Sequence, residues 1–342
     1  MNRNIVGSMS SSYLHSALII TLLISQTGCG LWKLSHAAPH DEQLHAKFDE
    51  NKLLPCFEGN PVTLSGLSHS VYCLRGSGTS KPPVVLLHEL PGLSAKTLEY
   101  AETLSKDFTV YIPMLFGELN QSAPGKGLFA FWFNGFFDFP FRGEWRSDLD
   151  STTPIVVWLR AVVDKISVRH GDKSIGVIGN CLTGSLPLAL LENKYVNAIV
   201  LAQPTLPLQI FSTDDLESVG ISQGVIGKAK DRLKRKENGS EFWVYGTRFE
   251  KDSLSGPNKQ EYLKGQFNDH YIRAEIPASE YLLTGSSSDD ERKKAHSTLI
   301  REWHLESPDG AASSRIRSEV RDFLKDPKSF CASWSSCAAS IR

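Results

Sequence analysis

Short apolar runs alternate with helical segments along most of this chain of 342 residues. A run of four to seven apolar residues bounded by turn residues is typical of a strand buried on both faces of a parallel sheet. We expect such strands at 84–87, 108–113, 174–179, 198–202, 241–246 and 270–276, and helices at 95–106, 151–169, 182–192, 221–237 and 313–326. The alternation predicts an α/β fold, with one mostly parallel central sheet and helices on both faces.

The remaining segments set the domain organisation. Residues 62–64 and 70–74 alternate like a two-strand meander ahead of the parallel sheet. The aromatic segment 116–147 has no clean period and is read as a loop or lid over the site, or alternatively as an irregular buried segment. No internal repeat is visible. The simplest division is therefore a single domain over 60–328, with a tether or helix at 30–59 and a tail at 329–342.

Charge disfavours nucleic acid as a partner. The chain has 37 basic and 38 acidic residues and a formal charge of −1. Such a balance gives no electrostatic attraction to a polyanion. We therefore expect a small-molecule partner.

The N-terminus reads as an export signal at 1–29. Its apolar run, residues 17–24, is shorter than the 20 or so residues of a membrane span and suits a signal peptide. The residues before Cys29 resemble a bacterial lipoprotein cleavage box, although Gln26 stands where an aliphatic residue is usual. Cleavage after Ala37 is the alternative. We expect an exported protein of the periplasm or cell envelope, whose one membrane contact would be a lipid on Cys29.

Cysteine usage is consistent with export. Apart from Cys29 and Cys181, the six cysteines form two local pairs, Cys56 with Cys73 and Cys331 with Cys337. In an oxidising compartment these pairs predict two disulfides, and four reduced thiols are the alternative. The pairs lack the spacing to nearby histidines that a zinc site needs, so no metal is expected.

The sharpest chemical motif is the segment from Val177 to Gly184. A buried strand that runs through Gly-x-Cys into a helix has the arrangement of a nucleophile elbow. The tight turn would lift the Cys181 side chain to the sheet's carboxyl edge, where the amide N–H groups of the following helix stabilise a thiolate. The alternative is a buried cysteine with no chemical role.

A second motif follows an earlier strand. His88-Glu89-Leu90-Pro91-Gly92 comes directly after the apolar run 84–87. In α/β-hydrolases the loop at this place supplies an oxyanion donor. A carboxylate there is costly without a role or a partner, so Glu89 is a candidate functional group, or a capping or ion-pairing residue.

Together the two motifs resemble the dienelactone hydrolase family of α/β-hydrolases. That family has His-Glu-hydrophobic-x-Gly after one strand and Gly-x-Cys-x-Gly-Gly after a later one. This chain departs from the pattern at Thr183, where the family has glycine. The resemblance covers residues 60–326 and is strongest at the two motifs.

The resemblance implies a Cys-Asp-His triad in that chain order. Cys181 is the implied nucleophile, and Asp252, which follows a strand by a short loop, is the implied acid, with Asp269 as the alternative. The implied base is His296, before the closing helix, with His304 as the alternative.

The remaining implied roles lie around that triad. Glu89 would help to activate the thiol, and the backbone N–H groups of Leu90 and Leu182 would bind the oxyanion. Arg142 and Arg146 could pair with a substrate carboxylate, or be solvated surface residues. The resemblance implies no cofactor.

The function expected from these residues is hydrolysis of an ester, lactone or thioester through an acyl-enzyme. The sequence leaves two other functions open. One is a binding or scaffold protein without catalysis, anchored to the envelope on the same fold. The other is acyl transfer by the same residues to an acceptor other than water.

Overall fold

The computed structural model describes residues 48–64, 66–120, 143–146, 148–207, 218–235, 241–280, 295–300 and 312–338. All of them belong to one compact unit, His40–Arg342. The expected signal segment with Cys29, the aromatic residues 129–141, Arg142 and His304 lie outside the described residues.

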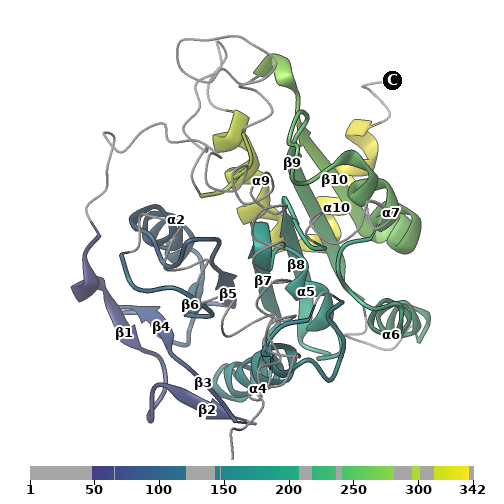
Figure 1. The fold of residues 1–342 in the computed structure, drawn as a ribbon. Helices are drawn as coiled ribbons and strands as arrows, with labels where there is room; N and C mark the ends of the chain where they lie inside the picture. Colours follow the sequence, from purple (N-terminus) through teal and green to yellow (C-terminus); the bar gives the residue numbers. More distant parts are fainter. Residues whose placement is uncertain are drawn as a thin grey trace, which may run out of the picture. The chain divides into compact units, whose positions relative to one another are not determined.

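A sheet of eight strands forms the centre of the fold (Figure 1). Its order is β1-β4-β6-β5-β7-β8-β9-β10. The first two strands run antiparallel to their neighbours, and the strands from β6 to β10 are parallel to one another. The bounds are β1 Leu53–Pro55, β4 Val71–Leu74, β5 Pro83–Leu87, β6 Thr109–Pro113, β7 Ile175–Asn180, β8 Val196–Ala202, β9 Trp243–Phe249 and β10 Tyr271–Ile276. The mostly parallel sheet and its strand order confirm the predicted α/β-hydrolase fold.

The N-terminal strands pair differently from the predicted meander. β2 (Val62–Leu64) pairs with β3 (Leu67–His69) in a small separate sheet, whereas β4 pairs with β1. β1 follows the 3₁₀ helix η1 (Glu50–Lys52) in the segment that the sequence analysis assigns to the tether. A disulfide joins Cys56, just after β1, to Cys73 of β4. The first predicted disulfide is therefore present.

Three helices cover one face of the sheet (Figure 1). They are α2 (Ala95–Ser105), α9 (Ala312–Lys325) and α10 (Pro327–Ala338). Alternate strand residues such as Val84, Val110 and Val200 share one buried cluster with Leu98 of α2 and Val320 of α9. Because strand side chains alternate between faces, this cluster defines one side of the sheet.

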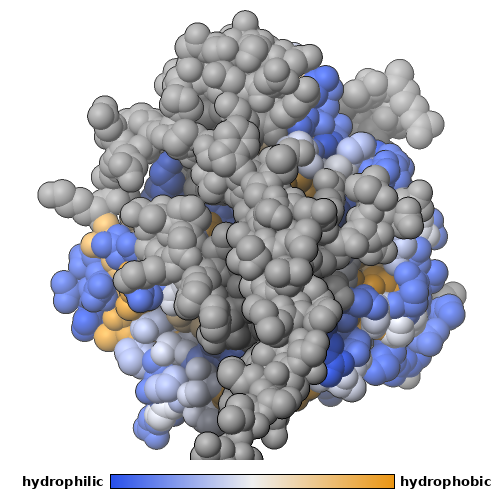
Figure 2. Space-filling view, viewed as in Figure 1, coloured by the Kyte–Doolittle hydropathy of each residue, from blue (hydrophilic) through white to orange (hydrophobic). Residues whose placement is uncertain are grey.

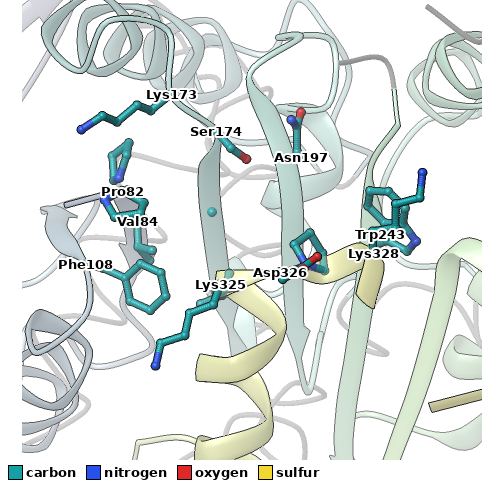
Figure 3. Close-up of a pocket in the computed structure, with 14 residues that line it drawn as sticks. Pro82, Val84, Phe108, Lys173, Ser174, Asn197, Trp243, Lys325, Asp326 and Lys328 are labelled. Carbon is teal, nitrogen blue, oxygen red and sulfur yellow. The ribbon is translucent and has the colours of Figure 1, made fainter. Parts of the chain in front are cut away.

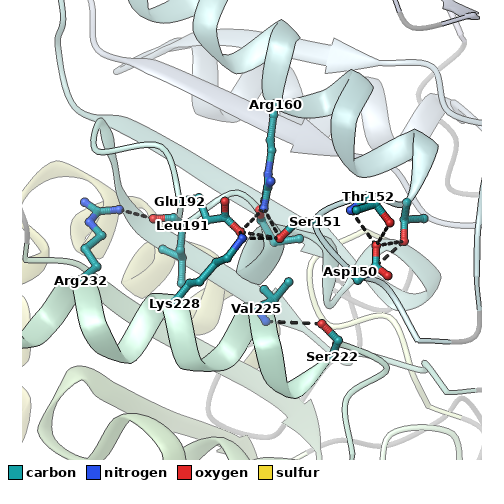
Figure 4. Close-up of polar contacts among 12 residues, drawn as sticks. Asp150, Ser151, Thr152, Arg160, Leu191, Glu192, Ser222, Val225, Lys228 and Arg232 are labelled. Atoms are coloured by element: carbon teal, nitrogen blue, oxygen red, sulfur yellow. Dashed lines mark hydrogen bonds and ion pairs between the residues drawn. The ribbon is translucent and has the colours of Figure 1, made fainter.

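The other face is covered by α4 (Pro154–Arg169), α5 (Leu186–Ala189), α6 (Gln223–Lys234) and α7 (Pro257–Phe267). Polar contacts connect several of these elements (Figure 4). Glu192, just after α5, forms ion pairs with Arg160 of α4 and Lys228 of α6. Arg232 of α6 donates to the carbonyl oxygens of Leu191 and Val196, which ties α6 to the start of β8.

The predicted C-terminal disulfide is wrong. The segment expected to be a looped tail is helix α10, and Cys331 is a buried thiol in it. Residues six positions apart in a helix are separated by about 9 Å along the axis, beyond the reach of a disulfide. Cys331 instead packs in the core against α9, where burial raises the pKa of its thiol to about 12.

The sheet has a topological switch point beside β5. The chain passes from β5 to β6 on one side of it and then to β7 on the other. In open α/β sheets, ligands bind outside the carboxyl ends of the strands at such a point. Glu89 follows β5 and Cys181 follows β7, so both motifs meet there.

Exposed parts of the described chain are mainly polar. In Figure 2 the coloured surface is mostly hydrophilic, with small scattered hydrophobic areas. Among the described helices, none combines the length and apolar composition that a membrane span requires.

Candidate active site

Cys181 stands on a strained turn directly after β7. Its φ is +54°, in the left-handed region that residues other than glycine rarely adopt. Two glycines make the turn possible. A Cβ on Gly179 would lie 2.4 Å from the carbonyl oxygen of Thr183, and one on Gly184 would lie 2.7 Å from Cα of Pro204. The sequence therefore folds this segment into the predicted elbow, with a Cys181 side chain that is 2% exposed.

Thr183 explains the departure from the family motif. Its hydroxyl accepts a hydrogen bond from the backbone N–H of Asn180 at 3.0 Å. It lies within donating distance of the carbonyl oxygens of Asn180, at 3.0 Å, and of His88, at 3.1 Å. The threonine thus connects the turn that carries Cys181 to the loop that carries Glu89, a contact that glycine could not make.

The helix predicted at 182–192 is much shorter than expected. The chain forms the 3₁₀ turn η3 (Cys181–Thr183) and then only four residues of α5. A macrodipole needs several aligned turns, so it contributes little here. The backbone of this turn therefore offers negative charge at Cys181 individual N–H groups and not a helix dipole.

Asp252 and His296 form a buried pair. Nδ1 of His296 lies 2.7 Å from Oδ2 of Asp252. The other carboxylate oxygen accepts from the backbone N–H groups of Leu254, at 2.8 Å, and Ser255, at 3.1 Å. Both oxygens of the carboxylate are therefore occupied, and the imidazole is held in one orientation.

Arg248 organises the loop that carries Asp252. Its side chain is 1% exposed and forms an ion pair with Glu275 of β10. Its guanidinium also donates to the carbonyl oxygens of Ser255, at 2.6 Å, and Glu250, at 2.8 Å. Arg248 is not predicted from the sequence, because nothing in the alternating strand pattern marks a buried cation.

The electrostatics of His296 depend on both Asp252 and Cys181. Burial alone would lower the pKa of His296, but its interactions with Asp252 and with Cys181 outweigh burial and hold that pKa well above its ordinary value. In the resting geometry Nε2 of His296 has no hydrogen-bond partner among the described residues. Catalytic hydrogen bonds are often loose without substrate. The structure thus places the imidazole of His296 against the carboxylate of Asp252 and within electrostatic reach of Cys181.

Glu89 contacts the same histidine loop. Its side chain is 2% exposed, and the hydroxyl of Ser297, the residue after His296, donates to its Oε1 at 3.0 Å. Arg317 of α9 holds the loop from the other side by donating to the carbonyl oxygen of Leu299 at 2.7 Å. The HE motif and the histidine are therefore parts of one site.

His88, the other half of that motif, is a structural residue. Its Nε2 accepts the backbone N–H of Leu115 at 3.0 Å, so its proton lies on Nδ1, which is 3.1 Å from the carbonyl oxygen of Glu89. Burial lowers the pKa of His88 to about 4. A neutral imidazole therefore fixes the path of the Glu89 loop.

Lys259 of α7 is a buried cation that the sequence analysis did not identify. Its side chain is 2% exposed and its Nζ donates to the carbonyl oxygen of Leu206. Burial lowers the pKa of Lys259 to about 7, although the charges of Asp252 and Cys181 oppose the change. A second ionisable group thus lies within electrostatic reach of the pair.

Two of the other candidates lie elsewhere. Arg146 is exposed and forms an ion pair with Asp150, as the surface interpretation expects. Asp269 is exposed in the 3₁₀ turn η5 (Asn268–His270), at the amino end of β10. Since Asp252 follows the carboxyl end of β9, the two aspartates lie at opposite edges of the sheet. Of these two aspartates, it is Asp252 that contacts His296.

A cavity of about 460 Å³ lies at the opposite edge from Cys181 (Figure 3). The amino ends of β5, β7, β8 and β9 and the junction of α9 with α10 line it. Its lysines already have partners: Lys173 donates to the carbonyl oxygen of Ser80, Lys325 pairs with Asp107, and Lys328 pairs with Glu241. Among the described residues no cluster of three or more acidic, histidine or cysteine side chains could hold a metal ion.

Comparisons with known proteins give only distant structural matches. No family model matches the sequence, and no curated protein does. Structural neighbours include a crystal structure of a putative dienelactone hydrolase from Klebsiella pneumoniae (16% identity, 62% of this chain and 81% of that one, TM-score 0.42). An esterase from Pyrococcus furiosus (12% identity, 75% and 86%, TM-score 0.44) is another. A third is Est1E from Butyrivibrio proteoclasticus with bound ferulic acid (12% identity, 77% and 96%, TM-score 0.47). At such scores the likeness carries no information on activity.

Proposed function

We propose that this protein is a hydrolase of carboxylic esters, lactones or thioesters that uses Cys181 as its nucleophile. The observation that carries the proposal is the buried pair of His296 and Asp252, 2.7 Å apart, within electrostatic reach of a cysteine on a left-handed turn. Nucleophile, base and orienting acid are the three parts that covalent catalysis of acyl transfer needs. All three come from segments after the carboxyl ends of strands, at the predicted edge.

In the proposed reaction, the thiol proton of Cys181 passes to Nε2 of His296 and the sulfur attacks the carbonyl carbon. The tetrahedral oxyanion collapses, the carbon–oxygen bond to the alcohol breaks, and His296 returns its proton to the leaving oxygen. Water then attacks the acyl thioester while His296 accepts its proton. The acid is released and the thiol is restored.

Asp252 and Glu89 have different roles in this proposal. Asp252 keeps the proton of His296 on Nδ1 and stabilises the imidazolium, whose formation the raised pKa of His296 favours. Glu89, held by Ser297, adjusts the protonation of the thiol when substrate enters. The backbone N–H groups of Leu90 and Leu182 bind the oxyanion.

The proposal includes an exported location. The disulfide between Cys56 and Cys73 supports an oxidising compartment, because such bonds rarely persist in the cytosol. We propose that residues 1–29 direct export and that Cys29 carries a lipid. The mass of the mature protein isolated from cell envelopes tests this, because a lipidated chain begins at Cys29 and is heavier than its amino acids alone.

The experiment for the proposed activity is a panel of aryl esters, lactones and aryl thioesters assayed with wild type, Cys181→Ala and Cys181→Ser. We expect turnover of at least one class by the wild type and a loss of at least about 1000-fold in Cys181→Ala. Cys331→Ala is the matched control, because it removes the other described thiol, which packs among core residues of α9 and α10. Wild-type turnover in Cys181→Ala contradicts the proposal.

Thiol labelling separates the enzyme from a scaffold on the same fold. Brief treatment with iodoacetamide followed by peptide mass spectrometry should modify Cys181 far faster than Cys331, because only an activated thiol is a strong nucleophile. Uniform inertness favours the scaffold. Adding alcohols or amines to the assay identifies acyl transfer, since the acceptor then takes the acyl group in place of water.

A further inference from the structure

Two residues with left-handed backbone stand next to each other at the carboxyl edge of the sheet. Asn180 of β7 is in register with Ala202 of β8, so the residues that follow, Cys181 and Gln203, take equivalent places on adjacent strands. Their φ angles are +54° and +38°. Neither residue type favours this region, and such strain persists mainly at functional sites. The strain at Gln203 is therefore a second sign of function beside the nucleophile.

The side chain of Gln203 holds the histidine loop. It is fully buried, and its Oε1 accepts hydrogen bonds from Oγ1 of Thr298 at 2.6 Å and from the backbone N–H of Thr298 at 3.3 Å. A backbone N–H can only donate, so the amide atom that faces it must be the oxygen. The orientation of the Gln203 amide is therefore fixed.

Stability alone does not explain this glutamine. Its amide nitrogen is buried and has no hydrogen-bond partner among the described residues. An unpaired buried donor is unfavourable, and so is the left-handed backbone. The favourable interaction that Gln203 makes is its contact with Thr298, two residues after His296.

That contact joins the histidine loop to the strand end beside Cys181, whereas Arg317 holds the loop from the side of α9. The described part of the loop, residues 295–300, contains neither helix nor strand. Asp252 orients the imidazole ring, and Ser297 contacts Glu89. Gln203, by contrast, ties the loop backbone to the strand end beside Cys181. The backbone of Gln203 is itself anchored, because its N–H donates to the carbonyl oxygen of Thr247 at 2.7 Å.

We propose that Gln203 is a positioning residue that, through Thr298, holds His296 at its working distance from Cys181. This inference rests on the proposed function, because it concerns the proton transfer between those two side chains. Displacement of a catalytic group by about 1 Å can lower a rate by up to about 100-fold. A loosened loop should therefore reduce kcat and leave substrate affinity nearly unchanged.

The test compares Thr298→Val with Thr298→Ser. Valine has the shape of threonine without the hydroxyl, whereas serine keeps the donor to Oε1. We expect Thr298→Val to lower kcat about tenfold with KM within about threefold of wild type, and Thr298→Ser to recover most of that loss. Gln203→Met should lower kcat at least as much as Thr298→Val.

A second readout isolates the position of His296. We expect Thr298→Val to slow the alkylation of Cys181 by iodoacetamide at pH 7 and to move the pH profile of alkylation to higher pH, because the imidazolium no longer lies close to the thiolate. A residue with a merely structural role would change the melting temperature and leave this profile unchanged. If Gln203→Met does not fold, the two Thr298 variants decide the question.

The outcomes separate the two proposals. Wild-type kcat and a wild-type alkylation profile in Thr298→Val, with Cys181→Ala inactive, overturn the role of Gln203 and leave the proposed function intact. Wild-type turnover in Cys181→Ala overturns both.

Discussion

The imidazole of His296 and the carboxylate of Asp252 meet at 2.7 Å in a site from which solvent is almost entirely excluded, with side chains 2% and 1% exposed. The carboxylate reaches the histidine from a loop after β9, and the histidine comes from a loop before α9. In the sequence, Asp252 follows β9 and His296 follows β10, the last two parallel strands.

Replacing Asp252 with asparagine should keep the shape of the site and remove the charge. Because the amide can also favour the wrong tautomer of His296, we expect kcat to fall by about 100- to 10,000-fold. Steady-state kinetics on any substrate found in the panel measure this. A loss of less than about fivefold would contradict the orienting role.

The same variant has a predicted effect on stability against pH. A histidine whose folded pKa is raised contributes stability that is complete below its unfolded pKa of about 6.5 and is lost as the pH rises through the folded pKa. The advantage of wild type over Asp252→Asn should therefore be largest near pH 6 and should shrink as the pH rises above 7. Urea unfolding at several pH values checks this, and an advantage that grew with pH would contradict it.

Lys259 should change the pH dependence of the unfolding free energy in the opposite direction. Its folded pKa of about 7 lies below the ordinary lysine pKa of 10.5, so between these values the unfolded state binds more protons. Stability then rises with pH, by up to about 1.4 kcal/mol for each pH unit. We expect wild type to gain on Lys259→Met between pH 7 and pH 10 in urea unfolding. Parallel stability curves would show that Lys259 is not buried as a charge.

Thr183 should be needed for its hydroxyl and not for its methyl group. In Thr183→Val the buried N–H of Asn180 loses its acceptor, which costs about 1–3 kcal/mol of unfolding free energy. Thr183→Ser keeps the hydroxyl and should lose no more than about 1 kcal/mol for the methyl group. Chemical denaturation of both variants, with kcat alongside, provides the comparison. Equal losses in the two variants would assign the role to packing.

Much of this site could be predicted from the sequence, because it depends on local motifs. Gly179 before Cys181 marks the elbow, and a carboxylate directly after a buried strand marks Glu89. Asp252 and His296 were predicted from the order of the triad in a similar family, and the structure places their side chains in contact, with His296 in electrostatic interaction with Cys181.

The missed residues share a physical reason. Lys259 and Gln203 are polar residues whose burial depends on tertiary packing, and α7, which carries the lysine, has no clear apolar period in the sequence. The predicted disulfide between Cys331 and Cys337 is wrong for a related reason. Closeness in sequence suggested a loop, whereas a helix holds six-residue neighbours apart.

The most direct measurement is to trap the acyl-enzyme. Wild type, Cys331→Ala and Cys181→Ala would each be mixed with an aryl ester from the panel, quenched in acid and digested, and the peptides analysed by mass spectrometry. We predict an acyl group on Cys181, released by hydroxylamine as a thioester is, and its absence in Cys181→Ala. Turnover with the acyl group on another residue, or undiminished turnover in Cys181→Ala, would contradict the cysteine mechanism.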